Sequence, residues 1–178
     1  MSTLYSRTAY SLRSKILHWI SATLVILLLI GGNLLSSLPP ELKKTSIFMH
    51  KSIGLTVLIL TILRIIFMLL DGRPALPVST AWYEKVLARL VQFALYICLI
   101  MMPVSGWIMS TSAGFPPNYF GLITIPFPGF SKNPELAKLF LEVHESIAWI
   151  IISLIVLHLA GNIKHFAIDK DKVVQTML

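Results

Sequence analysis

Four of the five histidines in this 178-residue chain lie at or inside long apolar segments. They are His18, His50, His144 and His158. A single intramembrane histidine is often a hydrogen-bonded contact between helices, but ionisable side chains are costly there, so four need a functional reason. Neutral imidazole is a common ligand of metal ions and of haem iron. The four residues therefore point to a metal or haem centre.

Their spacing arranges the histidines in two pairs. If the apolar segments alternate up and down, His18 and His158 lie near one membrane face, and His50 and His144 near the other. His144 and His158 are 14 residues apart, which in an α-helix is a rise of about 21 Å and returns to within about 40° of the same face. We expect two non-covalent haem b groups, one in each pair. With imidazole on both sides, the iron has no open position, which favours electron transfer over oxygen binding.

The interval of 14 residues recurs on two other segments. Gly32 follows His18 by this interval, and Arg64 follows His50 by the same interval. Gly32 would present bare backbone where a large ring approaches, and Gly54 would give similar clearance. Arg64 would reach the depth of the opposite haem and bind a propionate through two hydrogen bonds. The alternatives are ordinary helix packing for Gly32 and an end residue reaching the interface for Arg64.

Composition places these residues in a membrane. The chain is 56% apolar and only 13% charged, with a mean hydropathy of +0.79, whereas soluble domains are about 45–50% apolar and about 25% charged. We expect an all-α integral membrane protein, a single domain over residues 1–178 that forms an up-down bundle of four transmembrane helices around the haems. The expected spans are 16–38, 47–70, 90–112 and 138–166, and residues 113–133 form an interfacial loop without regular elements.

Charged residues suggest the orientation. Five basic residues flank one set of span ends, and ten flank the other: Arg7, Arg13, Lys15, Arg64, Arg73, Lys85, Arg89, Lys164, Lys170 and Lys172. The positive-inside rule then places both termini in the cytoplasm, with the bundle in the inner (cytoplasmic) membrane. The net charge of +7 forms no separate basic stripe, which argues against nucleic acid. The lone Cys98 excludes a disulfide and a cysteine-ligated cluster.

Other histidine chemistry fits less well. Zinc needs three or four converging ligands, which pairs at opposite membrane faces do not provide. A histidine relay that moves ions or protons is the alternative of a different class. It would require carboxylates in the interior of the spans, and transporters usually show repeats or broken helices. The sequence shows no internal repeat, and Glu142 and Glu145 precede the fully apolar part of the fourth span.

Several short motifs occur in order along the chain: LHWI at His18, HKSIG at His50, PVSGW from Pro103 to Trp107, HES at His144 and HLAGNIKHFAIDKD from His158. Over nearly the whole length, this combination resembles the bacterial four-helix di-haem cytochrome b561 family. The resemblance implies two b haems with ligands from the first, second and fourth helices. It also implies a quinone-linked electron carrier, in some members between ubiquinone and superoxide or another periplasmic partner.

Three further residues take their expected roles from this resemblance. Lys51 would lie near the periplasmic haem edge and attract a small anionic donor such as superoxide or an ascorbate-like species, or would only anchor the helix at the interface. Gln92 stands where relatives carry a histidine, which puts a quinone pocket at this position in doubt. His165 lies one heptad beyond His158, near a propionate or a quinone headgroup, or is simply solvated.

The expected function is electron transfer between a periplasmic-side donor or acceptor and membrane quinone. Quinone-linked oxidation of superoxide is its enzymatic form. The alternative is a haem b membrane anchor that passes electrons from a partner dehydrogenase or hydrogenase to quinone, as related cytochromes do. A homo-oligomer in the lipid bilayer is consistent with either function.

Overall fold

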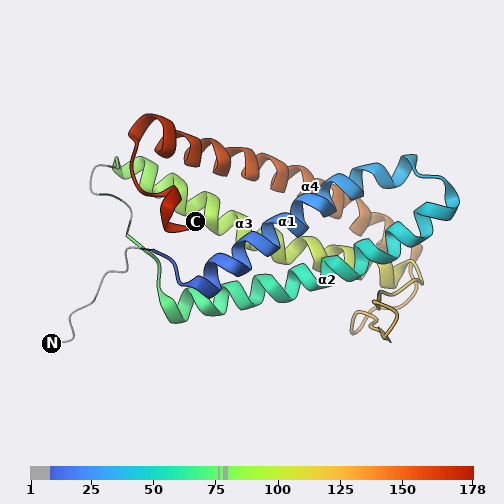
Figure 1. The fold of residues 1–178 in the computed structure, drawn as a ribbon. Coiled ribbons are helices and arrows are strands. Elements are labelled where there is room, and N and C mark those ends of the chain that lie inside the picture. Colours follow the sequence, from blue (N-terminus) through green and yellow to red (C-terminus); the bar gives the residue numbers. More distant parts are fainter. Residues whose placement is uncertain (1–8, 76, 78–79) are drawn as a thin grey trace.

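Four long helices account for most of the chain. The computed structural model describes residues 9–75, 77 and 80–178, and Arg7 lies outside this part. The helices are α1 (Leu12–Leu34), α2 (Pro40–Asp71), α3 (Trp82–Ser112) and α4 (Pro134–Ile163). Each is long and apolar enough to cross a membrane. Consecutive helices run in opposite directions and pack side by side (Figure 1). The expected four-helix membrane bundle is confirmed.

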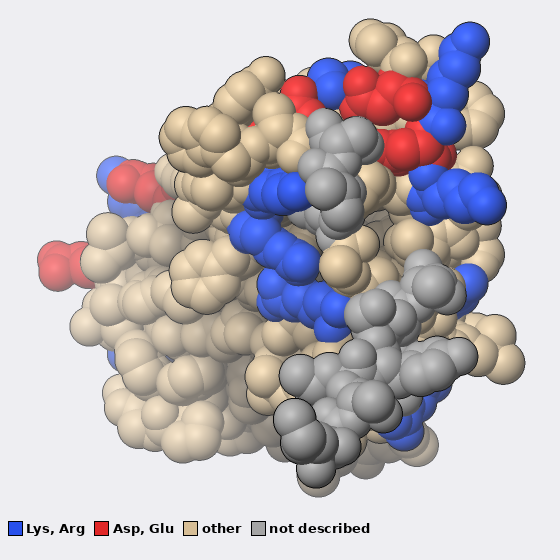
Figure 2. All heavy atoms as spheres, turned by 90° about the vertical axis from the view of Figure 1, so that its left-hand side faces the viewer, with Lys and Arg blue, Asp and Glu red and all other residues tan. Residues whose placement is uncertain are grey.

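The bundle has two ends, which we name by their helix termini. At the terminal end, α1 begins at Leu12 and α4 ends at Ile163; at the loop end, α2 begins at Pro40 and α4 begins at Pro134. Figure 2 looks at the terminal end and shows basic side chains across its middle, with acidic and basic ones together along its upper edge. Charged side chains thus gather at this end of the bundle, as in a protein that crosses a membrane.

Local signals explain where the helices begin. Pro40 and Pro134 stand at first helical positions, and Asn133 caps α4 by accepting a hydrogen bond from the Leu136 amide (3.1 Å). Proline suits this position because its fixed φ is already helical and its missing N–H would have no partner there. As a result α2 begins before residue 47, where its expected apolar span starts. Helix α3 also begins before its expected span, at Trp82 and not at residue 90, but its first residue has no side-chain cap. Hydropathy marks only the apolar part of each helix.

The segment between α3 and α4 contains a short hairpin, so the expectation of no regular element there is wrong. Strand β1 (Asn118–Tyr119) pairs antiparallel with β2 (Ile123–Thr124). The turn is possible because Gly121 takes a positive φ of 80°, a conformation that glycine adopts without steric cost. Trp107 of α3 donates a hydrogen bond to the Ile125 carbonyl (2.7 Å), which fastens the loop to the bundle.

A buried layer joins the helices at mid-bundle. It takes one apolar side chain from each helix: Val25, Val57, Leu99 and Ile151. Ile151 lies seven residues from both His144 and His158. The members from α1 and α2 likewise follow the histidine of their own helix by seven residues. The layer therefore lies between two levels of histidines and separates them.

Large apolar side chains cover the outside of the bundle. Leu27, Ile59, Phe93 and Val156 come from the four different helices, and each has at least half of its surface exposed. Continuous exposed apolar surface is unfavourable in water but matches the hydrocarbon of a bilayer. The chain is therefore a multi-pass membrane protein.

Candidate functional site

The histidines face one another in two pairs. The ring centroids of His50 and His144 are 6.3 Å apart near the loop end, and those of His18 and His158 are 6.5 Å apart near the terminal end. An imidazole nitrogen binds a transition metal at about 2.0–2.1 Å and lies about 1.1 Å from its ring centre, so rings on opposite sides of one ion have centres about 6.3 Å apart. Both pairs have the separation needed to bind one metal ion between them.

His144 is oriented by α3. Its Nδ1 lies 2.9 Å from the Met102 carbonyl oxygen and 3.1 Å from the Ser105 hydroxyl oxygen. A carbonyl only accepts hydrogen bonds, so Nδ1 carries the proton and Nε2 keeps its lone pair. Metal-binding histidines typically donate from the other ring nitrogen in this way, which fixes the tautomer and the ring orientation. Sequence reasoning missed both partners, because neither residue type is diagnostic of such a contact.

Two glycines pack directly against the loop-end pair. A Cβ added at Gly106 would lie 2.9 Å from Cε1 of His144, and one added at Gly32 would lie 3.2 Å from Cε1 of His50. The first distance is shorter than real Cβ contacts and the second is tight. Gly54 has nothing within 4 Å of such a Cβ, but it lines the cleft that also holds both histidines. Backbone without a side chain therefore lies directly against each of the two rings at one point.

Arg64 lies at the level of the terminal-end pair. Its guanidinium donates to the Ser21 hydroxyl and to Nδ1 of His18, both at 3.0 Å, and lies 5.3 Å from the Tyr96 ring centre. Ser21 is fully buried. Arg64 thus points into the bundle and does not reach outward to the interface.

Three candidate residues remain, namely Lys51, Gln92 and His165. Lys51 lines the loop-end cleft and its Nζ donates to the Phe115 carbonyl (2.8 Å). Gln92 is half-buried on α3. His165 is buried, with Nδ1 2.7 Å from an Asp171 carboxylate oxygen. The expectation of a solvated His165 is wrong because the following segment folds back over it.

The contact of Gly32 with His50 leads to a prediction. Changing Gly32→Ala should weaken cofactor binding at the loop-end pair, since the new methyl group forces the ring to move by a few tenths of an ångström. The matched control is Gly31→Ala, where an added Cβ meets nothing within 4 Å. Both changes raise helix propensity by about 0.5–1 kcal/mol, so a loss confined to Gly32→Ala is steric. Haem retained after detergent purification is the measurement, and equal retention in the two variants would contradict the prediction.

Comparison with known sequences now identifies the family. The sequence pattern of prokaryotic cytochrome b561 matches residues 9–178. The chain belongs to the prokaryotic cytochrome b561 family. It is 28% identical over 178 residues to "Cytochrome b561 homolog 2" of Escherichia coli (strain K12), covering 95% of this chain and 90% of the relative. It is also 28% identical over 166 residues to "Cytochrome b561 homolog 1" of the same organism, with coverage of 91% and 92%.

Membership makes the chain a cytochrome b561-type membrane electron-transfer protein and implies haem b. The resemblance inferred from the short motifs is confirmed. The donor set fits such a group: both imidazole pairs have the separation needed to hold one iron between them, and at Gly32 and Gly106 the chain has no Cβ that would crowd the loop-end rings. His144 also presents the required tautomer.

Proposed function

We propose that this protein is a di-haem b-type cytochrome that carries electrons between a donor or acceptor at the periplasmic face and quinone in the inner membrane. His50 and His144 would hold one haem, and His18 and His158 the other. The observation that carries the proposal is the presence of two facing imidazole pairs, 6.3 and 6.5 Å between centroids, near opposite ends of one bundle. On α4 the two levels are separated by 14 residues, about 21 Å of helix.

A haem b held by these histidine pairs would supply the exchange of single electrons. The chain's own part is to hold and orient the axial ligands and to exclude water. The Met102 carbonyl orients His144, and the apolar layer around Ile151 keeps the two levels apart. The low polarity around each histidine pair would help to set the reduction potential of the haem that it binds.

The contact between Arg64 and His18 would change when His18 binds a haem. A guanidinium only donates, so in the observed contact Nδ1 of His18 accepts and the ring proton lies on Nε2. Coordination through Nε2 requires the opposite tautomer, with the proton on Nδ1. With that tautomer, the guanidinium of Arg64 would be free to hold a haem propionate, an acceptor that would suit its two parallel donors. Ser21 remains within its reach.

We infer the orientation in the membrane from the distribution of basic residues. Arg13, Lys15, Arg73, Lys85 and Arg89 all lie at the terminal end, beside the first residues of α1 and α3 or the end of α2. We place this end, and with it both termini, in the cytoplasm. The loop-end pair and Lys51 then face the periplasm, where the ammonium group would favour a small anionic electron donor.

Haem content tests the proposal. The purified protein should contain about two haems per chain by the pyridine haemochrome assay, with b-type reduced-minus-oxidised bands. A colourless protein made with ample haem supply would instead support the histidine-relay transporter. Reduction by superoxide followed by reoxidation by ubiquinone would support the enzymatic form. The membrane anchor would be favoured if the protein copurifies with a dehydrogenase or hydrogenase, and if the isolated chain is neither reduced by superoxide nor reoxidised by ubiquinone.

A charge change at Arg64 should affect only one potential. Arg64→Met removes a positive charge beside the His18/His158 pair, so reduction of that haem becomes less favourable and its midpoint potential should fall, by on the order of 60 mV for a tenfold change in the equilibrium. Arg64→Lys keeps the charge, so the midpoint potential of this haem should lie between those of the unsubstituted protein and Arg64→Met. Redox titration of the α-bands measures this. Equal shifts of both haems, or a shift in Arg64→Lys as large as in Arg64→Met, would contradict it.

A further inference from the structure

The chain beyond α4 folds back across the terminal end of the bundle. The helix continues as a π-helical turn, η2 (Lys164–Asp169), which ends at Lys170 with a left-handed φ of 52°. A short 3-10 helix, η3 (Val174–Thr176), follows. Figure 1 shows this red segment turning from the end of α4 towards α1. We call residues 170–177 the return segment.

The far part of the return segment contacts α1 beside one of the histidines. The indole Nε1 of Trp19 donates to the Met177 carbonyl (3.0 Å), and the Tyr10 amide donates to the Thr176 carbonyl (3.1 Å). The Trp19 ring lies edge-on to the ring of its neighbour His18, with centroids 5.3 Å apart. The return segment is therefore linked to His18 through a single aromatic side chain.

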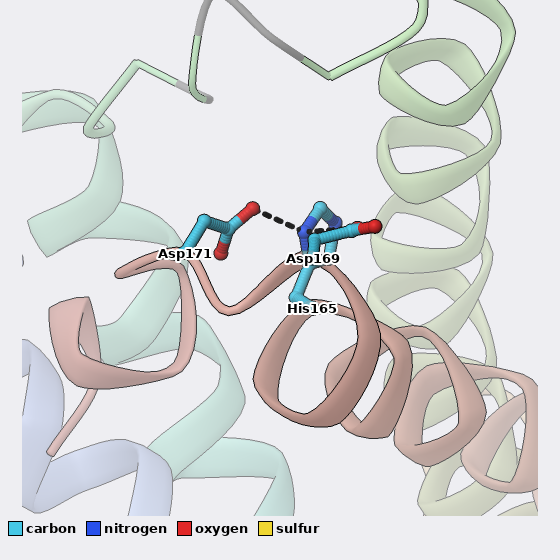
Figure 3. A group of neighbouring side chains, drawn as sticks. All are labelled: His165, Asp169 and Asp171. Atoms are coloured by element: carbon cyan, nitrogen blue, oxygen red, sulfur yellow. Dashed lines mark hydrogen bonds and ion pairs between the residues drawn. The ribbon is translucent and has the colours of Figure 1, made fainter.

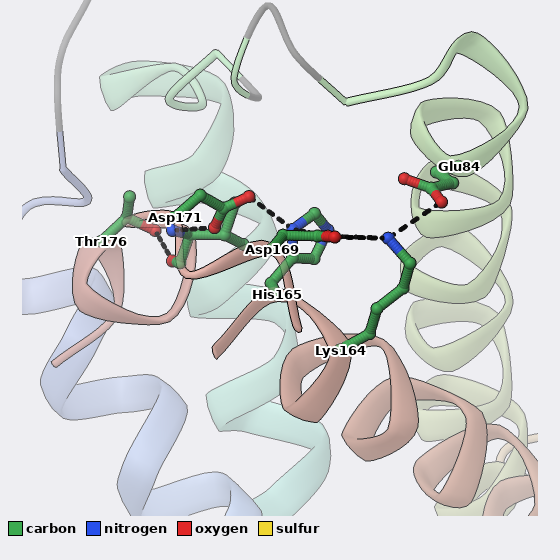
Figure 4. Close-up of polar contacts among 7 residues, drawn as sticks. Glu84, Lys164, His165, Asp169, Asp171 and Thr176 are labelled. Atoms are coloured by element: carbon green, nitrogen blue, oxygen red, sulfur yellow. Dashed lines mark hydrogen bonds and ion pairs between the residues drawn. The ribbon is translucent and has the colours of Figure 1, made fainter. Parts of the chain in front are cut away.

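The near part is fastened by a polar network. Nδ1 of the buried His165 lies 2.7 Å from Asp171 and 3.3 Å from Asp169 (Figure 3). Lys164 pairs with Asp169 (2.7 Å) and with Glu84 of α3 (3.0 Å), as Figure 4 shows. Ion pairs that share partners in a network hold a turn better than isolated exposed pairs do.

Inside the return segment, Asp171 also shapes the turn. Its Oδ1 accepts a hydrogen bond from the Val173 amide (2.9 Å), while its Oδ2 faces His165. One carboxylate thus bends the chain and fastens it to the end of α4. One end of the segment is thus anchored through Asp171 to His165 of η2, which continues α4, and the other end is anchored at α1 through Trp19. Helices α1 and α4 supply His18 and His158.

We propose that the return segment is a cap on the terminal-end site, which bridges α4 to α1, excludes water from the His18/His158 pair and positions His18 through Trp19. The inference rests on the proposed function, since the site it covers is the proposed site of one haem. Trp19 and Asp171 are positioning residues: they act through His18 and through the turn, and they do not contact the iron.

The test uses full-length proteins that carry one haem each. In a His144→Ala background, only the terminal-end haem remains, and in a His158→Ala background only the loop-end haem. Asp171→Asn or Trp19→Phe is added to each, and haem transfer to apomyoglobin is timed in detergent. We expect transfer about two- to tenfold faster in the first background, the range that the loss of one hydrogen bond implies, and an unchanged rate in the second.

A second readout separates positioning from general loosening. Trp19→Phe keeps an aromatic ring but lacks the donor to Met177, so the low-spin electron paramagnetic resonance g values of the terminal-end haem should shift while those of the other haem stay. Unchanged release and unchanged g values would overturn the cap, as would equal acceleration in both backgrounds. Absence of haem from the unsubstituted protein would overturn the proposed function together with the cap, whereas two haems with unaltered release would overturn the cap alone.

Discussion

Replacing His144 by alanine is expected to remove one of the two haems and leave the other in place. His144 and His50 face each other at 6.3 Å near the loop end, and a methyl group offers no lone pair to iron. His158→Ala should remove the other haem, because His158 belongs to the pair at the terminal end. The pyridine haemochrome assay should fall from about two haems per chain to about one in each variant, and to none when both changes are combined.

The fifth histidine supplies the control. His165 is buried and bonded to Asp171, so it is not available as an axial ligand in this arrangement. His165→Gln should therefore keep both haems at equilibrium. Loss of a haem in this variant, or full haem content in His144→Ala, would show that the ligand assignment is wrong. The two single variants should also differ in their spectra, since each retains a different haem.

The second large effect is expected at Gly106, a residue with no chemistry of its own. A Cβ there would lie 2.9 Å from Cε1 and 3.1 Å from Nδ1 of His144, and the ring is held in place by its bond to the Met102 carbonyl. Either α3 moves away or the imidazole loses its orientation. Overpacking of this kind costs about 1–3 kcal/mol, so Gly106→Ala should weaken haem binding at the loop-end pair by about five- to 150-fold.

The matched control for this variant is Gly161→Ala. Gly161 is exposed on α4, and an added Cβ meets nothing within 4 Å. Alanine favours a helix over glycine by about 0.5–1 kcal/mol, so propensity alone would stabilise both variants. Haem titration of the apoprotein, with the bands of the two haems followed separately, measures the effect. Equal haem affinity at the loop-end pair in Gly106→Ala and Gly161→Ala would contradict the steric explanation.

Together these variants separate two ways in which the protein holds a cofactor. The histidine variants remove a bond to iron, while the Gly106 variant keeps every ligand and changes only the space beside it. A bundle of this size buries few large side chains: the central layer contains one apolar residue from each helix. We therefore expect its stability to depend on the bound cofactors, because ligands that bind only the folded state stabilise it.

The depths of the site residues were determined by sequence. Rise and rotation per residue are fixed by the local geometry of the α-helix, so an interval of 14 residues sets both the level and the face of a side chain on its own helix. This is why Gly32 was predicted at the level of the opposite pair and why the structure places it against His50. The apolar runs likewise determined the number and direction of the four helices.

Tertiary structure alone decided what each of these residues touches. Periodicity does not state how neighbouring helices are rotated against each other, so the contacts of His144 with Met102, Ser105 and Gly106 were not predictable from any single segment. The surroundings of His165 were predicted wrongly for a related reason. Regular helix geometry was extended past Ile163, whereas the chain changes to a π-turn and folds back, and a reversal of this kind is stabilised by contacts between residues distant in sequence.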